Sequence, residues 1–304
     1  MTTICIVILS RNRPLFLEEA ILSALRQTKL PKKIIVSDNS TVEKSNILKL
    51  KKKYNEVEFI FNDSNEHMAD HYLRVLKNFK YDLIAICHDD DLLMPKYIEE
   101  VCITYRQFQN ATIISVNGKS LKDKNVSKEM MWKSKKKYVL VKKDQLFERW
   151  FNIDSDGVAP VSATVFNTNI LKTKFKYIKP DKNYGKNYWD TFFFLKIIEN
   201  SFFVWINKDL IRYRIHDSSV SNNSNLDYKI AYNLIVKNLN LNSYYAKILK
   251  KYRYIHLLIN LINRRKFFYK FIAIKLFLYL LIFSNYFKKS IFSKKIYKYL
   301  RKVI

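Results

Sequence analysis

The chain has 304 residues, of which 48% are hydrophobic and 15% aromatic, so it can bury a large core and is not intrinsically disordered. It contains only three glycines, Gly118, Gly157 and Gly185, and they lie far apart. Neither the glycine fingerprint of dinucleotide-binding folds nor a P-loop can be written with them. Both classes of nucleotide site are therefore excluded.

The net charge of +28 is distributed unevenly. Residues 228–304 contain 18 basic residues and no acidic one, which leaves 37 basic and 27 acidic residues before them. The positive charge therefore belongs mainly to a C-terminal appendage, not to a nucleic-acid-binding face. Cys5, Cys87 and Cys102 lie in apolar segments without metal-ligand spacing, and no basic and apolar leader precedes the first strand. We expect reduced core thiols in a cytoplasmic protein.

Strand and helix signals alternate over the first 116 residues. Apolar runs of strand length are found at residues 4–9, 33–38, 57–61, 82–87 and 112–116. Helices are predicted between them, over residues 15–28, 42–54, 67–78 and 95–108. The succession predicts an α/β fold with a mostly parallel central sheet and helices on both faces. Ligands bind such sheets beyond the carboxyl ends of the strands, where SRNR, SDNS and HDDD stand.

The middle of the chain predicts a mixed region. Residues 119–137 are charged and without a pattern, which is typical of a surface loop. Further helices are predicted over residues 142–151 and 189–200, and further strands over residues 163–166, 202–206 and 210–215. The composition changes after the polar segment at residues 218–225, so we predict one domain over residues 1–222 and a helical appendage over residues 223–304.

The appendage has the pattern of basic amphipathic helices. Its longest apolar run, residues 267–283, is interrupted by Lys270 and Lys275 and falls short of a membrane span. Basic helices with an aromatic and aliphatic face are typical of anionic membrane surfaces. We therefore expect peripheral binding to the inner face of the cell membrane. The alternative is a helical cap or a homodimer, and nucleic acid is disfavoured because the aliphatic runs would stay exposed.

The sharpest chemical signal is the sequence HDDD at residues 88–91. Three adjacent carboxylates repel one another, and a hard divalent cation, Mg²⁺ or Mn²⁺, would neutralise them together with a phosphate ligand. The alternative is that these acids only cap the helix that Pro95 opens and favour its dipole. That alternative explains one acid well and three poorly, so we favour a metal site.

Five segments, in order, resemble family 2 inverting glycosyltransferases of the GT-A fold. They are TICIVILSRNRPLFLEEAILSALRQT, IIVSDNST, YDLIAICHDDDLLMPKYIEE, NYWDTFFFLKI and RYRIHDSSVS. The resemblance implies a nucleotide-binding half over residues 1–118 and an acceptor-binding half over residues 119–222. It also implies transfer of a sugar from a nucleotide-sugar, most simply UDP-linked, to a lipid-linked or polysaccharide acceptor during synthesis of a bacterial surface glycan.

The same resemblance implies a nucleotide pocket. Its residues would come from the ends of the first, second and fourth strands, namely Ser10, Arg11, Asn12, Arg13, Asp38 and Asp89. Asp38 would accept a hydrogen bond from the uracil ring, and Asp89 would lie near the ribose. Arg74 and Arg214, which do not belong to these three strand ends, are further candidates, although an exposed helix face explains Arg74 almost as well.

The resemblance places the metal, Mn²⁺ or Mg²⁺, on Asp90, with Asp91 as an adjacent ligand. His216 would touch the metal or the diphosphate from the far side. His88 stands where the family usually has an acid, which leaves the ligand register open by one residue. Arg212 and Arg214 share a strand face with His216, so the three predict a cationic clamp for a diphosphate.

Asp190 would be the general base that takes the proton of the acceptor hydroxyl. It lies in an aromatic stretch where desolvation should raise its pKa, although it also fits a helix N-cap. Asp154 and Asp156 are alternative bases. Two other functions stay open. One is a non-catalytic binding protein with a degenerate transferase domain, because His88 stands in place of an acid; the other is a sugar-phosphate nucleotidyltransferase. The latter usually has a glycine-rich N-terminal loop, and this chain has no glycine before Gly118.

Overall fold

The structure is a computed structural model that describes residues 2–62, 66–151, 158–175 and 185–217. Nearly all of them belong to the first of two compact units, which comprises residues 1–143 and 157–226. Of the second unit, residues 144–156 and 227–304, the structure describes only α5 (Lys143–Phe151). The predicted appendage and the alternative bases Asp154 and Asp156 therefore lie outside the described residues.

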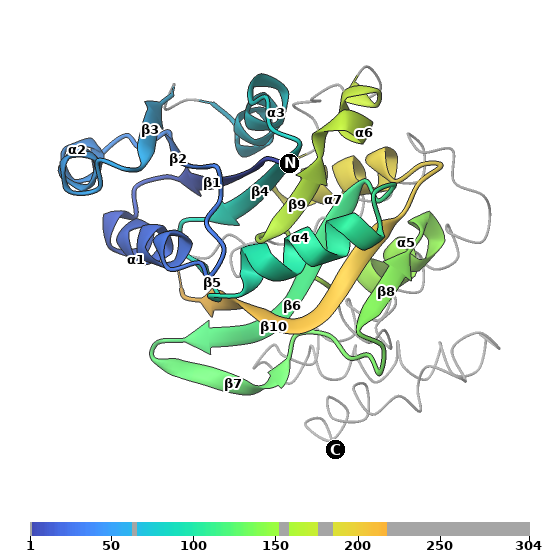
Figure 1. Ribbon diagram of the computed structural model, residues 1–304. Helices are drawn as coiled ribbons and strands as arrows, with labels where there is room; N and C mark the ends of the chain where they lie inside the picture. The colour runs from blue at the N-terminus through green and yellow to red at the C-terminus, as the bar shows by residue number, and fades with distance from the viewer. Residues whose placement is uncertain (1, 63–65, 152–157, 176–184, 218–304) are drawn as a thin grey trace, which may run out of the picture. The chain divides into compact units, whose positions relative to one another are not determined.

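The N-terminal part alternates strands and helices as predicted. The elements are β1 (Ile4–Ser10), α1 (Pro14–Leu25), β2 (Lys33–Asp38), α2 (Lys44–Lys53), β3 (Glu58–Phe61), α3 (Met68–Asn78) and β4 (Leu83–His88). Their strands pair in parallel in the order β3-β2-β1-β4 (Figure 1). β1 is buried along its whole length, as its continuous apolar sequence requires between two neighbouring strands and two layers of helices.

The second part of the sheet is mixed. It contains β5 (Leu92–Leu93), α4 (Tyr97–Gln107), β6 (Ile113–Lys122), β7 (Asn125–Met130), β8 (Tyr138–Val141), β9 (Thr164–Asn167), α6 (Thr168–Lys172), α7 (Gly185–Ile197) and β10 (Phe203–Ile215). The sheet order is β3-β2-β1-β4-β9-β6-β10-β5, with β7 paired to β6 and β8 to β10. β9 is antiparallel to β4 and β6, whereas β10 is parallel to β6. The α/β class with a helix-covered central sheet is confirmed.

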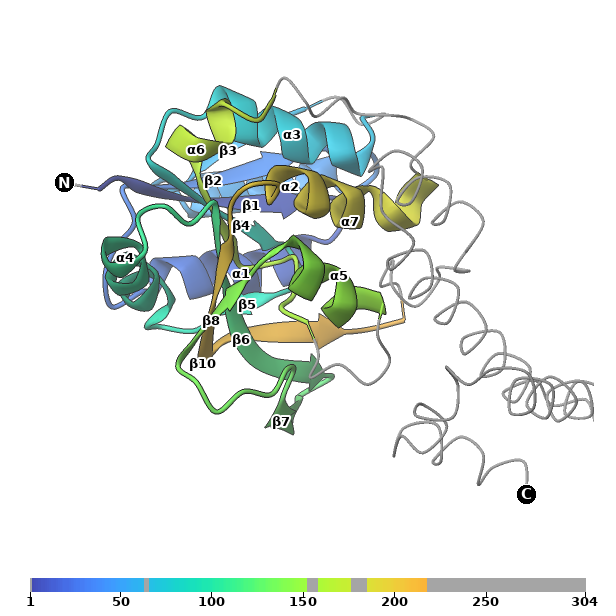
Figure 2. The ribbon, with the colours of Figure 1, turned by 90° about the vertical axis from the view of Figure 1, so that its right-hand side faces the viewer.

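Different helices cover the two faces of the sheet (Figure 2). Ile6 and Ile8 of β1 pack into one core with buried residues of α1, α2 and α4. On the other face an aromatic cluster joins α3, β9 and α7, where the rings of Tyr72, Phe166 and Phe193 contact one another. Free, buried thiols are found where the sequence predicted them, at Cys5, Cys87 and Cys102.

The prediction of a surface loop over residues 119–137 is wrong. β6 continues to Lys122, and a two-residue turn returns the chain as β7. Asp123 has a φ of 54°, the left-handed conformation that tight hairpin turns use. No residue of β7 is buried, so pairing with β6, and not an apolar face, makes this segment a strand.

The prediction of two separate strands over residues 202–215 is also wrong, because β10 is continuous. The chain stays in the sheet through two register shifts against β6, on either side of Asp209. The two backbones come very close beside these shifts: a Cβ at Gly118 would lie 2.1 Å from the carbonyl oxygen of Ile211. Glycine is therefore required at this position of β6.

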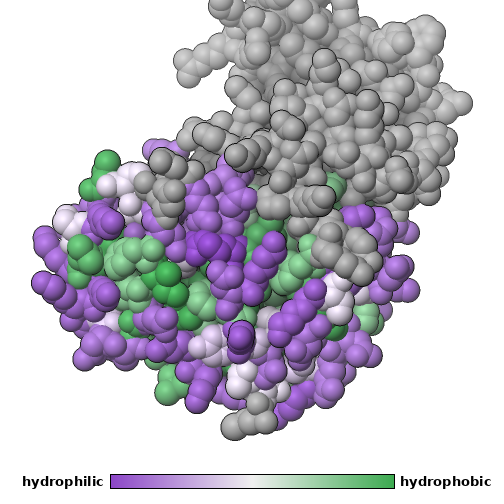
Figure 3. Space-filling model, turned by 90° about the horizontal axis from the view of Figure 1, so that it is seen from above, coloured by the Kyte–Doolittle hydropathy of each residue, from purple (hydrophilic) through white to green (hydrophobic). Residues whose placement is uncertain are grey.

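On the face seen from above, hydrophobic residues show between hydrophilic ones (Figure 3). Among the described residues, no helix combines the length and the apolar character needed to cross a membrane.

Candidate metal and nucleotide site

The carboxyl ends of three parallel strands meet at one edge of the sheet. In the register of β1 with its neighbours, Ser10 lies opposite Asp38 of β2, and Leu9 lies opposite His88 of β4. The turn that follows β4, residues 88–91, is called the acidic turn below. The three segments expected to carry the chemistry therefore lie side by side.

β10 brings the far end of the domain to the acidic turn. β5 follows the turn at once and pairs antiparallel with β10, so the end of β10 passes beside it. The main-chain N–H of Arg214 donates to Asp91 Oδ1 at 2.8 Å, and Arg214 Nε donates to the carbonyl oxygen of Asp90 at 2.8 Å. His216 Nε2 lies 3.0 Å from Asp90 Oδ2. Residues about 125 positions apart are joined at this point.

The loop after β1 supplies a cation to the same turn. Arg13 Nη2 lies 2.6 Å from Asp89 Oδ1, and Arg13 Nη1 lies 2.5 Å from Asp90 Oδ2. The main-chain N–H of Arg11 donates to the other oxygen of Asp89 at 3.0 Å. Oδ1 of the fully buried Asp89 thus makes an ion pair and Oδ2 accepts a hydrogen bond, and one guanidinium bridges two of the three carboxylates.

The three acids do not share one protonation state. Burial, and then the charge of Asp90, raises the pKa of Asp91 to about 8. Burial likewise raises the pKa of Asp89 to about 7, although Arg13 opposes it. Burial alone would also raise the pKa of Asp90, but Arg13, His88 and His216 outweigh it, and the net shift is downward. The buried turn therefore tolerates three full negative charges only with more cation than Arg13 supplies.

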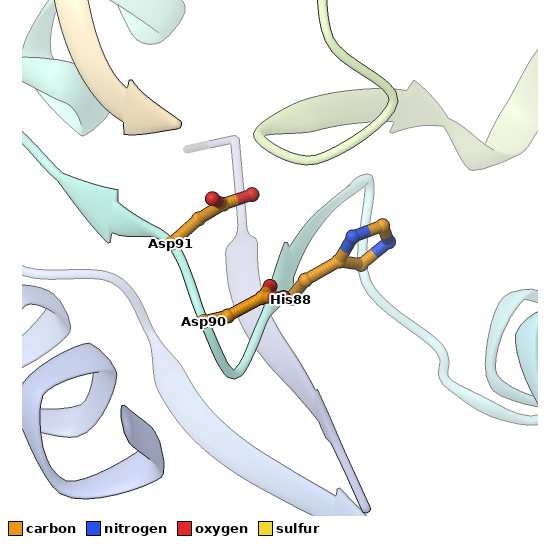
Figure 4. A group of neighbouring side chains, drawn as sticks. All are labelled: His88, Asp90 and Asp91. Carbon is orange, nitrogen blue, oxygen red and sulfur yellow. The ribbon is translucent and has the colours of Figure 1, made fainter. Parts of the chain in front are cut away.

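Three side chains of the turn form a group that suits a divalent metal. His88, Asp90 and Asp91 each offer a ligand atom, and these atoms lie within 4.8 Å of one another (Figure 4). Asp91 Oδ2 is buried without a hydrogen-bond partner among the described residues. Burial lowers the pKa of His88, so its ring is neutral and able to bind a metal. These observations fit a metal with oxygen and imidazole ligands.

His88 is a candidate ligand that sequence reasoning missed. The sequence marks it only as a departure from an acidic pattern, because a motif does not show on which side of a turn each side chain lies. The alternative in which the acids cap the next helix is wrong. β5 lies between the turn and α4, which begins at Tyr97, and the N-cap residue of α4, Lys96, makes no side-chain cap bond.

Two of the predicted nucleotide-binding residues stabilise loops. Asn12, with a φ of 56°, accepts a hydrogen bond at Oδ1 from the main-chain N–H of Thr41, which ties the β1 loop to the β2 loop. Both carboxylate oxygens of Asp38 accept bonds from Ser40, one from its N–H and one from its hydroxyl. The hydroxyl of Ser10 is buried without a hydrogen-bond partner among the described residues. Of these three side chains, only that of Ser10 has no hydrogen-bond partner among the described residues.

The two predicted nucleotide-binding arginines outside the β1 loop form ion pairs within the protein. Arg74 of α3 makes a bidentate pair with Glu66, with both distances 2.8 Å, and no contact among the described residues joins it to the acidic turn. Arg214 also donates through Nη2 to Glu19, and its guanidinium lies over the ring of Phe16 at 4.5 Å. Its side chain, only 9% exposed, supports the acidic turn in the structure.

Asp190 is the sixth residue of α7, so its interpretation as a helix N-cap is wrong. Its Oδ1 accepts the main-chain N–H of Thr191 at 2.6 Å, and burial raises the pKa of its carboxyl. Burial, and then the charge of Asp190, raises the pKa of the Tyr72 phenol. Among the described residues, no contact joins Asp190 to the acidic turn.

A family model matches the part of the chain that contains most of this site. The model of glycosyl transferase family 2 matches residues 5–164, which is more than half of the chain and includes β1, β2 and the acidic turn. The chain belongs to glycosyl transferase family 2. Enzymes of this family commonly use a divalent metal. A comparison with curated protein sequences found no match.

Solved structures match the fold of this member of glycosyl transferase family 2. A crystal structure of S. aureus TarS covers 88% of the chain with a TM-score of 0.60 and 16% identity. The match covers 47% of that TarS chain, so the present chain spans about half of its length. TarS 1-349 in complex with UDP-GlcNAc covers 83% of the chain and matches over 71% of its own length, with a TM-score of 0.60 and 13% identity. The complex with UDP covers 84% and matches over 72%, with a TM-score of 0.59 and 16% identity.

Proposed function

We propose that this chain transfers a sugar from a UDP-linked donor, with inversion, to a hydroxyl of a lipid-linked or polysaccharide acceptor during synthesis of a bacterial surface glycan. The observation that carries the proposal is the convergence of Arg13, Asp90 and His216 at the carboxyl edge of the parallel strands. TarS structures in complex with UDP and with UDP-GlcNAc support a UDP-linked donor.

Mn²⁺ or Mg²⁺ would be held by Asp90 and Asp91, with His88 or His216 as the nitrogen ligand. When bound, the metal supplies positive charge that stabilises the departing diphosphate. Arg13 already lies against Asp89 and Asp90, so its guanidinium is placed to add a second positive charge at the same position. The hydroxyl of Ser10, which is buried without a hydrogen-bond partner among the described residues, would donate to a phosphate or ribose oxygen.

Asp190 would take the proton of the acceptor hydroxyl as that oxygen attacks the anomeric carbon. Its raised pKa brings the carboxylate closer to the basicity that proton transfer at neutral pH requires. The alternative base is Asp156. A single displacement of this kind inverts the configuration of the sugar.

The appendage, residues 223–304, would hold the enzyme on the inner, anionic face of the cell membrane, where lipid-linked acceptors are found. Deletion of the residues after position 240 should release the protein from anionic liposomes. Unchanged binding would refute the anchor. A change from dimer to monomer on the same deletion would assign the appendage to self-association.

The deciding experiment is hydrolysis of a panel of nucleotide-sugars with and without Mn²⁺, in the absence of acceptor. Metal-dependent release of UDP, lost in Asp90→Ala, would support the transferase. Formation of UTP after addition of pyrophosphate would identify a nucleotidyltransferase instead. Absence of tight nucleotide binding with every divalent metal would leave the non-catalytic binding protein.

A further inference from the structure

Residues 119–137, called the lysine-rich hairpin below, carry a charge that the described part of the chain does not neutralise. They contain eight lysines and two acidic residues. Lys119 pairs with Asp209 at 3.8 Å, and Lys133 pairs with Glu129 at 3.7 Å. The remaining lysines are exposed and form no ion pair with described residues: Lys122, Lys124, Lys128, Lys135, Lys136 and Lys137.

The hairpin is fixed by buried polar contacts. Asn117 Nδ2 donates to the carbonyl oxygen of Trp132 at 2.8 Å. Asn207 Nδ2 donates to the carbonyl oxygen of Ser134, and its main-chain N–H donates to that of Lys137, both at 2.8 Å. The Trp132 ring also contacts that of Trp205, with centroids 5.4 Å apart. The backbone that carries the exposed lysines is therefore fixed, and their shared positive charge attracts anions.

The tip of the hairpin borders the candidate site. β6 and β10 are parallel, with Leu121 opposite Arg214 and Lys122 opposite Ile215. Neighbouring strands lie about 4.8 Å apart, so Lys122 is one strand away from the segment that contacts Asp90 and Asp91. The two strands end side by side with β7 next to them (Figure 1). From this tip the exposed lysines continue along the hairpin and its return to β8.

We propose that the lysine-rich hairpin binds the acceptor, and that this acceptor is an extended anionic chain with phosphate or carboxylate groups along its length. The inference rests on the proposed function and adds the class of acceptor to it. β7 has six residues and is about 20 Å long, enough to contact several charged groups of one chain. Val126 is the one large hydrophobic side chain exposed in the hairpin, so there is little apolar area to enter a bilayer.

Hydrogen–deuterium exchange of the full chain, read by mass spectrometry, tests the surface directly. The probe is inorganic polyphosphate, with orthophosphate and phosphatidylglycerol vesicles as the other arms. We expect polyphosphate to slow exchange in peptides that cover residues 119–137 and orthophosphate to leave them unchanged. Slower exchange with vesicles but not with polyphosphate would overturn the proposal in favour of a lipid surface. No effect of polyphosphate on these peptides would also overturn it.

A charge-matched pair of variants tests the lysines themselves. The hairpin variant combines Lys122→Ser, Lys124→Ser and Lys128→Ser. The control variant combines Lys29→Ser, Lys32→Ser and Lys80→Ser; these three lysines are exposed and precede β2 and β4 at the opposite edge of the sheet. Both variants retain the basic appendage, so its contribution to binding is the same. The hairpin variant should bind polyphosphate about tenfold more weakly and reduce the slope of log affinity against log salt by about 2. Equal weakening in both variants would overturn the proposal.

The hydrogen–deuterium exchange measurements test the anion-binding proposal on the wild-type protein, even if the hairpin variant fails to fold. Hydrolysis of UDP-sugars without acceptor is measured separately. If polyphosphate protects the hairpin but no nucleotide-sugar is hydrolysed, the anion-binding surface stands and the proposed function fails. If hydrolysis occurs but the hairpin is unprotected, the acceptor proposal alone fails.

Discussion

Arg214 Nε donates a hydrogen bond to the main-chain oxygen of Asp90, 2.8 Å away. The main-chain N–H of the same arginine donates to the side chain of Asp91, so β10 fixes two successive residues of the acidic turn. Glu19 and Phe16 hold the guanidinium in place. These contacts make Arg214 a positioning residue for the proposed metal ligands.

Substitution of Arg214 should therefore weaken metal binding before any donor is added. We expect Arg214→Ala to lower Mn²⁺ affinity about 10- to 100-fold, the usual effect of removing a residue that orients metal ligands. Arg214→Lys should lose less. Calorimetric titration of the donor-free protein measures both. Arg212→Ala is the matched control, because Arg212 lies on the same strand but pairs with Asp209; an equal loss there would contradict the role of Arg214.

Metal affinity should rise with pH between about 6 and 8. Burial, and then the charge of Asp90, raises the pKa of Asp91 to about 8, so its carboxyl holds a proton at neutral pH that a bound cation must displace. Titration in buffers of different ionisation enthalpy would measure the released protons, and Asp91→Asn should release fewer, with Asp89, whose pKa burial raises to about 7, as the remaining source in the turn. The same shift predicts that the metal-free protein loses stability as pH rises from about 4 to about 8, because the unfolded state gives up this proton first.

Gly118→Ala should destabilise the domain by about 1–3 kcal/mol, because its methyl group would overlap the carbonyl oxygen of Ile211. Thermal unfolding would show this as a lower midpoint. Ser120→Ala, two residues along the same strand, is the control and should change the midpoint little. A wild-type midpoint in Gly118→Ala would mean that β6 and β10 are farther apart than described.

Asp190→Asn should lower turnover by about two orders of magnitude or more, as expected when a positioned base is removed, and leave UDP binding intact. Steady-state kinetics and UDP titration together separate the two effects. Glu199→Gln makes the same chemical change just beyond α7, in a surface ion pair, and should retain activity. Retained turnover in Asp190→Asn would transfer the role of base to Asp156.

Much of the fold could be predicted because short apolar stretches of the sequence identify its strands. β1, β2 and β4 are continuous apolar runs buried inside a parallel sheet, and their carboxyl ends are where polar motifs begin. The hairpin at residues 119–137 could not be predicted, because β7 has no buried face. Its pairing depends on contacts of Asn117 and Asn207 with residues distant in sequence.

The candidate site was predictable in residue types but not in contacts. The sequence placed a metal at the acidic turn, but the orientation of His88 depends on the backbone of that turn. The contacts of Arg214 depend on pairing between β5 and β10, which have no local signal linking them. Asp38 and Asn12 show the same limit: their bonds to Ser40 and Thr41 exist only once the two loops lie together.

The guanidinium of Arg13 bridges Asp89 and Asp90 and neutralises part of the charge of the acidic turn at rest. A metal ion at the proposed site would compete with this guanidinium, so a dissociation constant measured by titration would report an exchange of cations and not simple binding. Loss of this arginine should then have opposite effects on two steps. The metal ion should bind more easily, whereas the departing diphosphate should be less well stabilised. One side chain would thus set the resting charge of the pocket and assist in product formation.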